Sequence, residues 1–148
     1  MVNLIIGGYM ITAEHIETYE PPTQVIDGHE VMDSIYDEYA CFFVIKDGMY
    51  RSAAELFQIT DGVWEFSRLI THRKCRKQGI AKAIIKRLMQ FCEDEKINLV
   101  TWVAPYADEE AMKFEDLRRF YIKQGFQETK YPDKVILVCG DGDFSNFI

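Results

Sequence analysis

The stretch that decides the fold runs from Trp64 to Met89 and reads WEFSRLITHRKCRKQGIAKAIIKRLM. It begins as an apolar strand, continues as a basic loop with a single glycine, and ends in a helical pattern whose apolar face includes Ile80, Ile84 and Leu88. A helix N-terminus leaves backbone N–H groups unpaired and carries partial positive charge, so it attracts anions. The loop before this helix adds four basic side chains, Arg73, Lys74, Arg76 and Lys77. The stretch therefore predicts a site for a phosphate-bearing ligand, with an ordinary solvated basic turn as the alternative.

Charge is divided unevenly along the chain. Residues 1–66 hold two basic and twelve acidic side chains, residues 67–87 hold eight basic and none acidic, and residues 88–148 hold seven basic and twelve acidic. One basic block in an otherwise acidic chain indicates an anionic ligand there, unless it is only a solvated helix face. The net charge of −7 argues against nonspecific binding to nucleic acid or to an anionic membrane.

Length and composition favour one domain over residues 1–148, because 148 residues with 48% hydrophobic content can bury a sizeable core. The four cysteines are widely spaced and match neither a zinc site nor a disulfide framework, which predicts reduced thiols, no metal and a cytoplasmic protein. The apolar run from Leu4 to Ile11 is too short to span a bilayer and has no basic leader.

Periodicity and turn residues predict the following elements. We expect a first strand at 2–11 bent at Gly7-Gly8, and a helix from Asp27 to Tyr39 with Val31 and Ile35 on its apolar stripe. Asp-Gly turns then separate three strands, and later strands and helices alternate. The expected ranges are strands at 41–45, 50–59 and 63–71, a helix at 79–95, a strand at 97–103, a helix at 109–124, strands at 126–130 and 134–139, and a loose tail.

Two short motifs occur in a suggestive order on these elements. Residues 76–81 read RKQGIA, which fits the pattern Q/R-x-x-G-x-G/A, and residues 120–126 read FYIKQGF, an aromatic residue and Tyr before Gly-Phe. In these two motifs, and in the order of its elements along nearly the whole chain, the sequence resembles the GNAT superfamily of N-acetyltransferases. The resemblance implies an α/β fold with a mixed, mostly antiparallel sheet flanked by helices. The pattern departs at Phe114, where family members often carry Asn.

The resemblance implies acetyl-CoA as the co-substrate. Backbone amides from Arg76 to Ala81 would hold its diphosphate, with Gly79 allowing close approach and Arg76 and Lys82 adding charge. In the family, the end of the preceding strand pairs with the pantetheine arm, and an amide near Ile70 would face the thioester oxygen. The implied cofactor-binding residues are Leu69, Ile70, Thr71, Arg76, Lys77, Gln78, Gly79, Ile80, Ala81 and Lys82.

Two catalytic candidates follow from the same resemblance. Tyr121 would protonate the departing thiolate, although it also sits on an apolar helix stripe and could be a core aromatic. Glu65 would act as the base that deprotonates the amine, or is a solvated strand carboxylate. We expect a structural or phosphate-facing role for His72, and an exposed, isolated His29. A covalent role for Cys75 is disfavoured, since the family transfers the acyl group directly.

The sequence thus predicts transfer of an acetyl group from acetyl-CoA to a primary amine by direct attack in a ternary complex. The amine would be a small cationic amine, a lysine or a peptide amine, drawn in by acidic side chains at 30–38 and 108–110 unless these are solvated faces. No nucleic acid or membrane partner is expected, and a homodimer is left open. The alternative function is a catalytically weak or silent GNAT-fold protein that acts by binding a partner protein.

Overall fold

The computed structural model describes residues 3–6, 9–12, 23–105 and 112–148, with side chains described from residue 23 onward. The chain forms two compact units. Unit 1 comprises residues 1–57 and 67–90, and unit 2 comprises residues 58–66 and 91–148. Two strands and one helix contribute residues to both units, so each unit is described by itself below.

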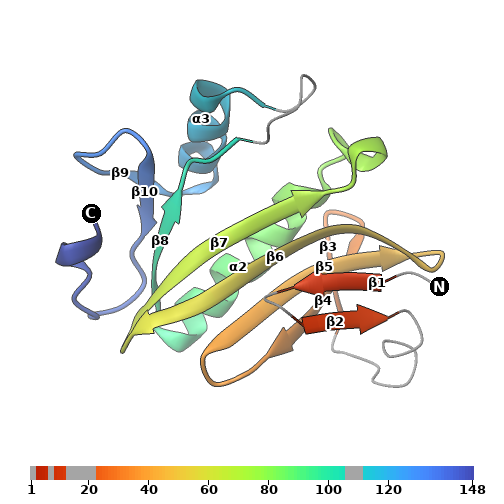
Figure 1. Ribbon diagram of the computed structural model, residues 1–148, viewed down its shortest axis with the longest axis horizontal. Coiled ribbons are helices and arrows are strands. Elements are labelled where there is room, and N and C mark those ends of the chain that lie inside the picture. Colours follow the sequence, from red (N-terminus) through yellow and green to blue (C-terminus); the bar gives the residue numbers. More distant parts are fainter. Residues whose placement is uncertain (1–2, 7–8, 13–22, 106–111) are drawn as a thin grey trace. The chain divides into compact units, whose positions relative to one another are not determined.

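Unit 1 contains most of the strands (Figure 1). β1 (Asn3–Ile6) and β2 (Tyr9–Thr12) pair antiparallel as a two-stranded sheet. The others follow in chain order: β3 (Thr23–Ile26), β4 (His29–Ile35), β5 (Tyr39–Lys46), β6 (Met49–Thr60) and β7 (Val63–Thr71). After β7 come the short 3-10 helix η1 (Arg73–Cys75) and the helix α2 (Ile80–Glu95). Residues 58–60 of β6, 63–66 of β7 and 91–95 of α2 belong to unit 2.

Unit 2 adds β8 (Asn98–Trp102), α3 (Phe114–Gln124), β9 (Gln127–Glu128), β10 (Lys134–Leu137) and the 3-10 helix η2 (Ser145–Phe147). The strand order of the main sheet is β3-β4-β5-β6-β7-β8-β10-β9. β7 and β8 pair parallel, whereas β3–β4, β4–β5, β5–β6, β8–β10 and β10–β9 pair antiparallel. This mixed, mostly antiparallel sheet with two α-helices confirms the predicted fold class.

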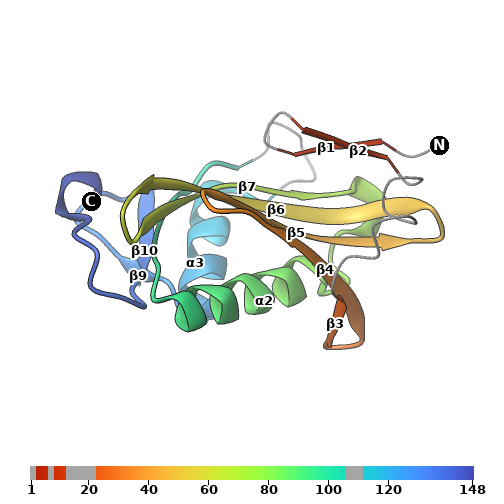
Figure 2. The same cartoon turned by 90° about the horizontal axis from the view of Figure 1, so that it is seen from below.

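Within unit 1, α2 lies along one face of β4 to β7 (Figure 2). The helix residues predicted to face a sheet, Ile80, Ala83, Ile84 and Leu88, are all buried. Phe42 of β5 and Leu56 of β6 are fully buried. Burying these apolar side chains supplies the main driving force for the α2–sheet contact, at roughly 2 kcal/mol for each large one.

The predicted helix from Asp27 to Tyr39 is wrong, because this segment forms the β3–β4 hairpin and the turn into β5. Asp27 and Gly28 both have positive φ, 50° and 83°, as a type I′ hairpin turn requires. The apolar spacing of Val31 and Ile35 suggested a helix. Instead Val31 and Asp33 are buried on one face of β4, because residues two apart on a strand share a face, and Ile35 is 45% exposed at the end of the strand.

Three further expectations need correction. The N-terminal segment forms two paired strands rather than one bent strand. The chain after β10 is not a loose tail, because Phe144, Phe147 and Ile148 pack on the buried residues Val63 and Val100. The helix predicted at 109–124 begins at Phe114, and residues 106–111 lie outside the described part of the chain. Among the described residues, no helix has the length and apolar character needed to cross a membrane.

Candidate functional site

The end of β7 is tied to β6 just before the basic loop. The Ser52 hydroxyl of β6 donates a hydrogen bond to the carbonyl oxygen of Ile70 at 2.9 Å and lies 2.9 Å from the Thr71 hydroxyl. The backbone N–H of His72 donates to the carbonyl oxygen of Arg51 at 2.8 Å. Ile70 therefore presents its carbonyl to β6, and because backbone groups alternate along a strand, those of Thr71 face the other edge.

The parallel ladder between β7 and β8 covers only part of β7. It pairs Val63–Phe66 with Asn98–Thr101. The remaining residues of β7, Ser67–Thr71, lie beyond the last pair and belong to unit 1. The residues predicted to bind the pantetheine arm, Leu69, Ile70 and Thr71, thus lie in the part of β7 beyond its pairing with β8.

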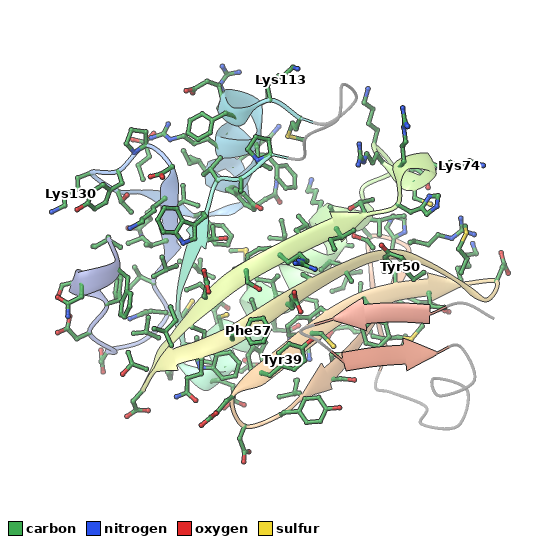
Figure 3. The ribbon with its side chains drawn as sticks, in the orientation of Figure 1. Tyr39, Tyr50, Phe57, Lys74, Lys113 and Lys130 are labelled. Carbon is green, nitrogen blue, oxygen red and sulfur yellow. The ribbon has the colours of Figure 1, made fainter. Side chains whose placement is uncertain are left out.

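His72 and Cys75 shape the turn that follows β7. The Nδ1 atom of His72 accepts a hydrogen bond from the backbone N–H of Lys74 at 3.2 Å, and the Cys75 N–H donates to the His72 carbonyl at 2.8 Å. The Cys75 side chain is buried, and its sulfur accepts from Arg51 Nη1 at 3.4 Å. Lys74 extends outward from this turn (Figure 3). His72 and Cys75 thus serve to hold the loop, whereas Lys74 is presented to solvent.

The loop that enters α2 has an unusual backbone. Lys77 and Gly79 both adopt left-handed conformations, with φ of 65° and 78°, while Arg76 is extended. A left-handed conformation is strained for a side chain such as lysine and natural for glycine. The Gly79 carbonyl accepts the first helical hydrogen bond, from Ala83 N–H at 3.0 Å. The amides of Ile80, Ala81 and Lys82 therefore occupy the first turn, where no helical carbonyl is available to them.

The predicted loop residues differ in exposure. Lys77, Gln78, Gly79 and Lys82 are exposed, whereas Arg76 and Ala81 are half-buried and Ile80 is buried in the core. Ile80 can thus offer only its backbone to a ligand. Two exposed lysines beside a helix N-terminus and a left-handed glycine make a surface suited to a diphosphate.

His29, at the start of β4, is a site residue that the sequence reasoning missed. It was expected to be isolated, yet its Nε2 atom lies 3.0 Å from the carbonyl oxygen of Gln78, forming a hydrogen bond across 49 residues. A correctly assigned Asp27-Gly28 hairpin turn would have placed His29 at a strand start. Its contact with the loop has no local sequence signal.

Part of the basic block is paired inside unit 1 and is not available to a ligand. Lys86 Nζ lies 2.7 Å from Asp27 Oδ2, and Arg87 Nη2 lies 2.9 Å from Asp33 Oδ2. The Arg87 guanidinium also lies over the Phe42 ring, 5.4 Å from its centroid. Lys86 lowers the pKa of Asp27 through its hydrogen bond. The charge division in the sequence therefore reflects helix–hairpin pairing as well as the exposed cations of the loop.

Only part of the acidic segment that was predicted to attract a cationic amine is exposed. Asp33 is buried and paired with Arg87, so it is part of the unit 1 core contact rather than an acceptor surface. Glu30, Asp37 and Glu38 are exposed on β4 and the turn into β5. The acidic residues at 108–110 lie outside the described residues.

A buried carboxylate on β6 is a second feature that the sequence did not reveal. Glu55 is 4% exposed, and its carboxylate accepts a hydrogen bond from the Tyr39 hydroxyl at 3.4 Å and lies 3.5 Å from Arg68 Nε. Tyr39 also packs on Phe57, with ring centroids 4.9 Å apart. The two labelled side chains lie side by side in Figure 3. Burial, with smaller contributions from Cys41 and Glu55, raises the pKa of Tyr39. This cluster lies on the sheet face opposite α2, because Tyr39 and Glu55 alternate with Phe42 and Leu56.

Tyr121 lies in unit 2, on the buried side of α3. Its ring is 5% exposed and contacts Phe66 and Phe126, with centroid separations of 5.9 Å and 5.6 Å. The helix ends at Gly125, whose left-handed backbone gives φ of 118°. Tyr121 therefore packs in an aromatic cluster, and its acid role stays a prediction.

Glu65 also lies in unit 2, half-buried on β7 and opposite Val100 of β8. Its neighbours Trp64 and Phe66 contact Phe91 of α2 and Tyr121 of α3. Because strand side chains alternate, Glu65 points to the other face of β7 from Tyr121. The structure therefore separates the two predicted catalytic residues by one layer of sheet.

All four cysteines are free thiols, as the sequence predicted. Burial raises the pKa of Cys41 to about 11 and also raises that of Cys92. Within the described ranges, no three His, Cys, Asp or Glu side chains cluster in a way that could hold a metal ion. Neither thiol is poised as a nucleophile, because the reactive species is the thiolate.

Comparison with known proteins identifies the class. A family model described as an acetyltransferase (GNAT) domain matches residues 38–128, and the chain therefore belongs to the GNAT acetyltransferase family. No curated protein matches the chain significantly. The single-domain organisation and a cytoplasmic location stay predictions from the sequence, which leaves a homodimer open.

The solved structures that share the fold include the following three. The ribosomal-protein-S18-alanine N-acetyltransferase from Escherichia coli has a TM-score of 0.54 and 16% identity, with 77% of each chain covered. A GNAT family acetyltransferase from Elizabethkingia anophelis with acetyl-CoA bound has a TM-score of 0.54 and 13% identity, covering 68% of this chain and 76% of that one. A GNAT family acetyltransferase from Staphylococcus aureus Mu50 has a TM-score of 0.56 and 13% identity, with 68% of each chain covered.

Proposed function

We propose that this protein is an acetyl-CoA-dependent N-acetyltransferase that acetylates a primary amine. The observation that carries the proposal is the loop at the N-terminus of α2, where left-handed Lys77 and Gly79 precede a first turn whose amides lack helical acceptors. Lys77 and Lys82 are exposed beside these amides. A doubly charged diphosphate fits this arrangement, because it needs several donors and positive charge without burial of a lone cation.

Acetyl-CoA supplies an acetyl thioester, whose carbonyl carbon is attacked by the amine nitrogen as the carbon–sulfur bond breaks. The amine must lose a proton and the sulfur must gain one. We assign the first role to Glu65, acting through water from one face of β7, and the second to Tyr121, which packs on the other face. The backbone near Ile70, chiefly that of Thr71 because the Ile70 carbonyl already accepts from Ser52, would hold the pantetheine arm.

Isothermal titration calorimetry with CoA tests the cofactor assignment. Gly79→Glu places a carboxylate and a strained left-handed side chain in the loop, since Gly79 has φ of 78°. We expect its affinity for CoA to fall by at least about tenfold, which corresponds to about 1.4 kcal/mol. Gly48→Glu is the matched control, because Gly48 has φ of 71° in the β5–β6 turn and would meet nothing within 4 Å. Equal affinity in the Gly79 and Gly48 variants contradicts the assignment.

Thermal unfolding with and without acetyl-CoA distinguishes an enzyme from a fold that only binds a partner protein. A ligand at one hundred times its Kd stabilises the folded state by about 2.7 kcal/mol. A clear increase in Tm supports the transferase, and no change favours the partner-binding alternative. Turnover measured against polyamines, aminoglycosides, amino acids, basic peptides and proteins then identifies the acceptor.

A further inference from the structure

A contact from the β3–β4 hairpin reaches the loop that precedes α2. His29 is the first residue of β4, and its Nε2 atom lies 3.0 Å from the carbonyl oxygen of Gln78. A carbonyl oxygen only accepts hydrogen bonds, so Nε2 must carry the proton and donate. A Cβ atom built at Gly79 would lie 3.9 Å from the same Nε2 atom, which shows that the imidazole sits beside the peptide joining Gln78 and Gly79.

This hydrogen bond acts on a peptide unit whose orientation matters for anion binding. The peptide group is planar and trans, so its N–H points opposite to its C=O. Holding the Gln78 carbonyl toward His29 therefore directs the Gly79 N–H away from His29. The residues on either side of Gln78, Lys77 and Gly79, both have left-handed backbone conformations, with φ of 65° and 78°. Strain of this kind persists only if surrounding contacts maintain the conformation, and the His29 hydrogen bond is such a contact on the next residue, Gln78.

We propose that His29 is a positioning residue for the diphosphate loop. It does not touch the ligand in this assignment. It fixes the Gln78–Gly79 peptide so that the loop amides are already oriented before the ligand binds, which lowers the cost of ordering on binding. The inference rests on the proposed function, since it takes the loop to be the CoA site.

The same hairpin supplies a control contact. Asp27, in the turn before β4, lies 2.7 Å from Lys86 Nζ, and both side chains are about half exposed, at 47% and 45%. This pair joins the hairpin to the middle of α2 and makes no contact with the Gln78 carbonyl. Asp27→Asn removes the charge from the pair while asparagine tolerates the left-handed backbone at this position. It therefore weakens hairpin–helix attachment without removing the loop contact.

The test measures binding of CoA by calorimetry in five proteins: wild type, His29→Ala, His29→Asn, His29→Gln and Asp27→Asn. A glutamine amide places a donor near the position of His Nε2, whereas the shorter asparagine does not reach it. Loss of one hydrogen bond corresponds to about three- to tenfold in affinity. We expect that loss in His29→Ala and His29→Asn, with affinity within about twofold of wild type in His29→Gln and Asp27→Asn.

A ligand without a diphosphate separates positioning from a general loss of structure. Binding of pantetheine, followed by NMR titration, should be unchanged in His29→Asn relative to wild type. Equal weakening of pantetheine and CoA overturns the inference, as does wild-type affinity for CoA in His29→Asn. If the wild-type protein itself binds no CoA, the proposed function fails and the inference fails with it. Normal binding by the wild type and by His29→Asn overturns the role of His29 alone.

Discussion

Arg87 of α2 and Asp33 of β4 form an ion pair of 2.9 Å with side chains only 15% and 9% exposed. The guanidinium also lies over the Phe42 ring of β5. Removing one partner leaves a largely buried charge, so Asp33→Ala should lower the free energy of unfolding by about 3 kcal/mol, measured by urea denaturation. Adding Arg87→Met should recover part of this loss, because the uncompensated charge is then absent. Strictly additive losses would show that the two residues are not coupled.

Asn98 at the start of β8 should be a stability determinant of unit 2. Its side-chain oxygen accepts from the N–H groups of Cys139 and Gly140, both at 2.9 Å, and its amide donates to the Gly142 carbonyl at 2.8 Å. Asn98→Ala leaves three backbone groups without these partners and should cost about 3 kcal/mol of stability. Asn98→Asp keeps the acceptor oxygen and should cost less. Denaturant unfolding of both variants checks the order.

The buried thiols predict a loss of stability in alkaline solution. Burial raises the pKa of Cys41 from 9.0 to about 11. The folded state therefore favours the neutral thiol. The resulting contribution to the free energy of unfolding is fully present below pH 9 and is lost as the pH rises toward 11. The difference between these two pKa values corresponds to about 2–3 kcal/mol of unfolding free energy. Cys41→Ala should flatten the decline in unfolding free energy across this range, whereas an unchanged slope would contradict the shift.

Tyr121→Phe separates chemistry from packing in the aromatic cluster of unit 2. The substitution keeps the ring that contacts Phe66 and Phe126 and removes only the hydroxyl group. If Tyr121 is the acid, kcat should fall by about a hundredfold with little change in the KM for acetyl-CoA. Tyr131→Phe is a suitable control, because Tyr131 is 41% exposed and also in unit 2. Undiminished turnover in Tyr121→Phe would leave only the packing role.

Glu65→Gln tests the base. The amide has nearly the same size as the carboxylate and cannot accept a proton, so kcat/KM should fall by about tenfold to a hundredfold at neutral pH. The loss in kcat/KM should become smaller as the pH approaches the pKa of the free amine, because the amine is then already deprotonated. A pH–rate profile that parallels the wild type at every pH would remove Glu65 from this role.

The stretch around the loop was predictable because its signals are local. A helix with an apolar face needs residues three and four apart, and the range 79–95 has them, so α2 matches the prediction almost to the residue. The Asp47-Gly48 and Asp61-Gly62 turns were likewise assigned from adjacent residues. These features depend on neighbours in the chain, which a sequence displays directly.

The β3–β4 hairpin was mispredicted for a specific reason. Val31 and Asp33 both lie on the face toward α2, but a carboxylate at a buried strand position does not look apolar in a sequence. The alternation was therefore hidden, and the spacing of Val31, Ile35 and Tyr39 favoured a helix. The partner that makes Asp33 tolerable there, Arg87, is 54 residues away.

By itself, the sequence determined the basic loop, its glycine, the helix that follows and the family pattern around them, because each depends on short-range backbone and periodicity rules. Tertiary structure alone decided which charges remain for a ligand. Lys86 and Arg87 are taken by Asp27 and Asp33, while Lys77 and Lys82 stay exposed. It also placed His29 on the Gln78 carbonyl. Pairings between residues some fifty positions apart follow no sequence period, and they form only when the sheet brings the hairpin to the helix.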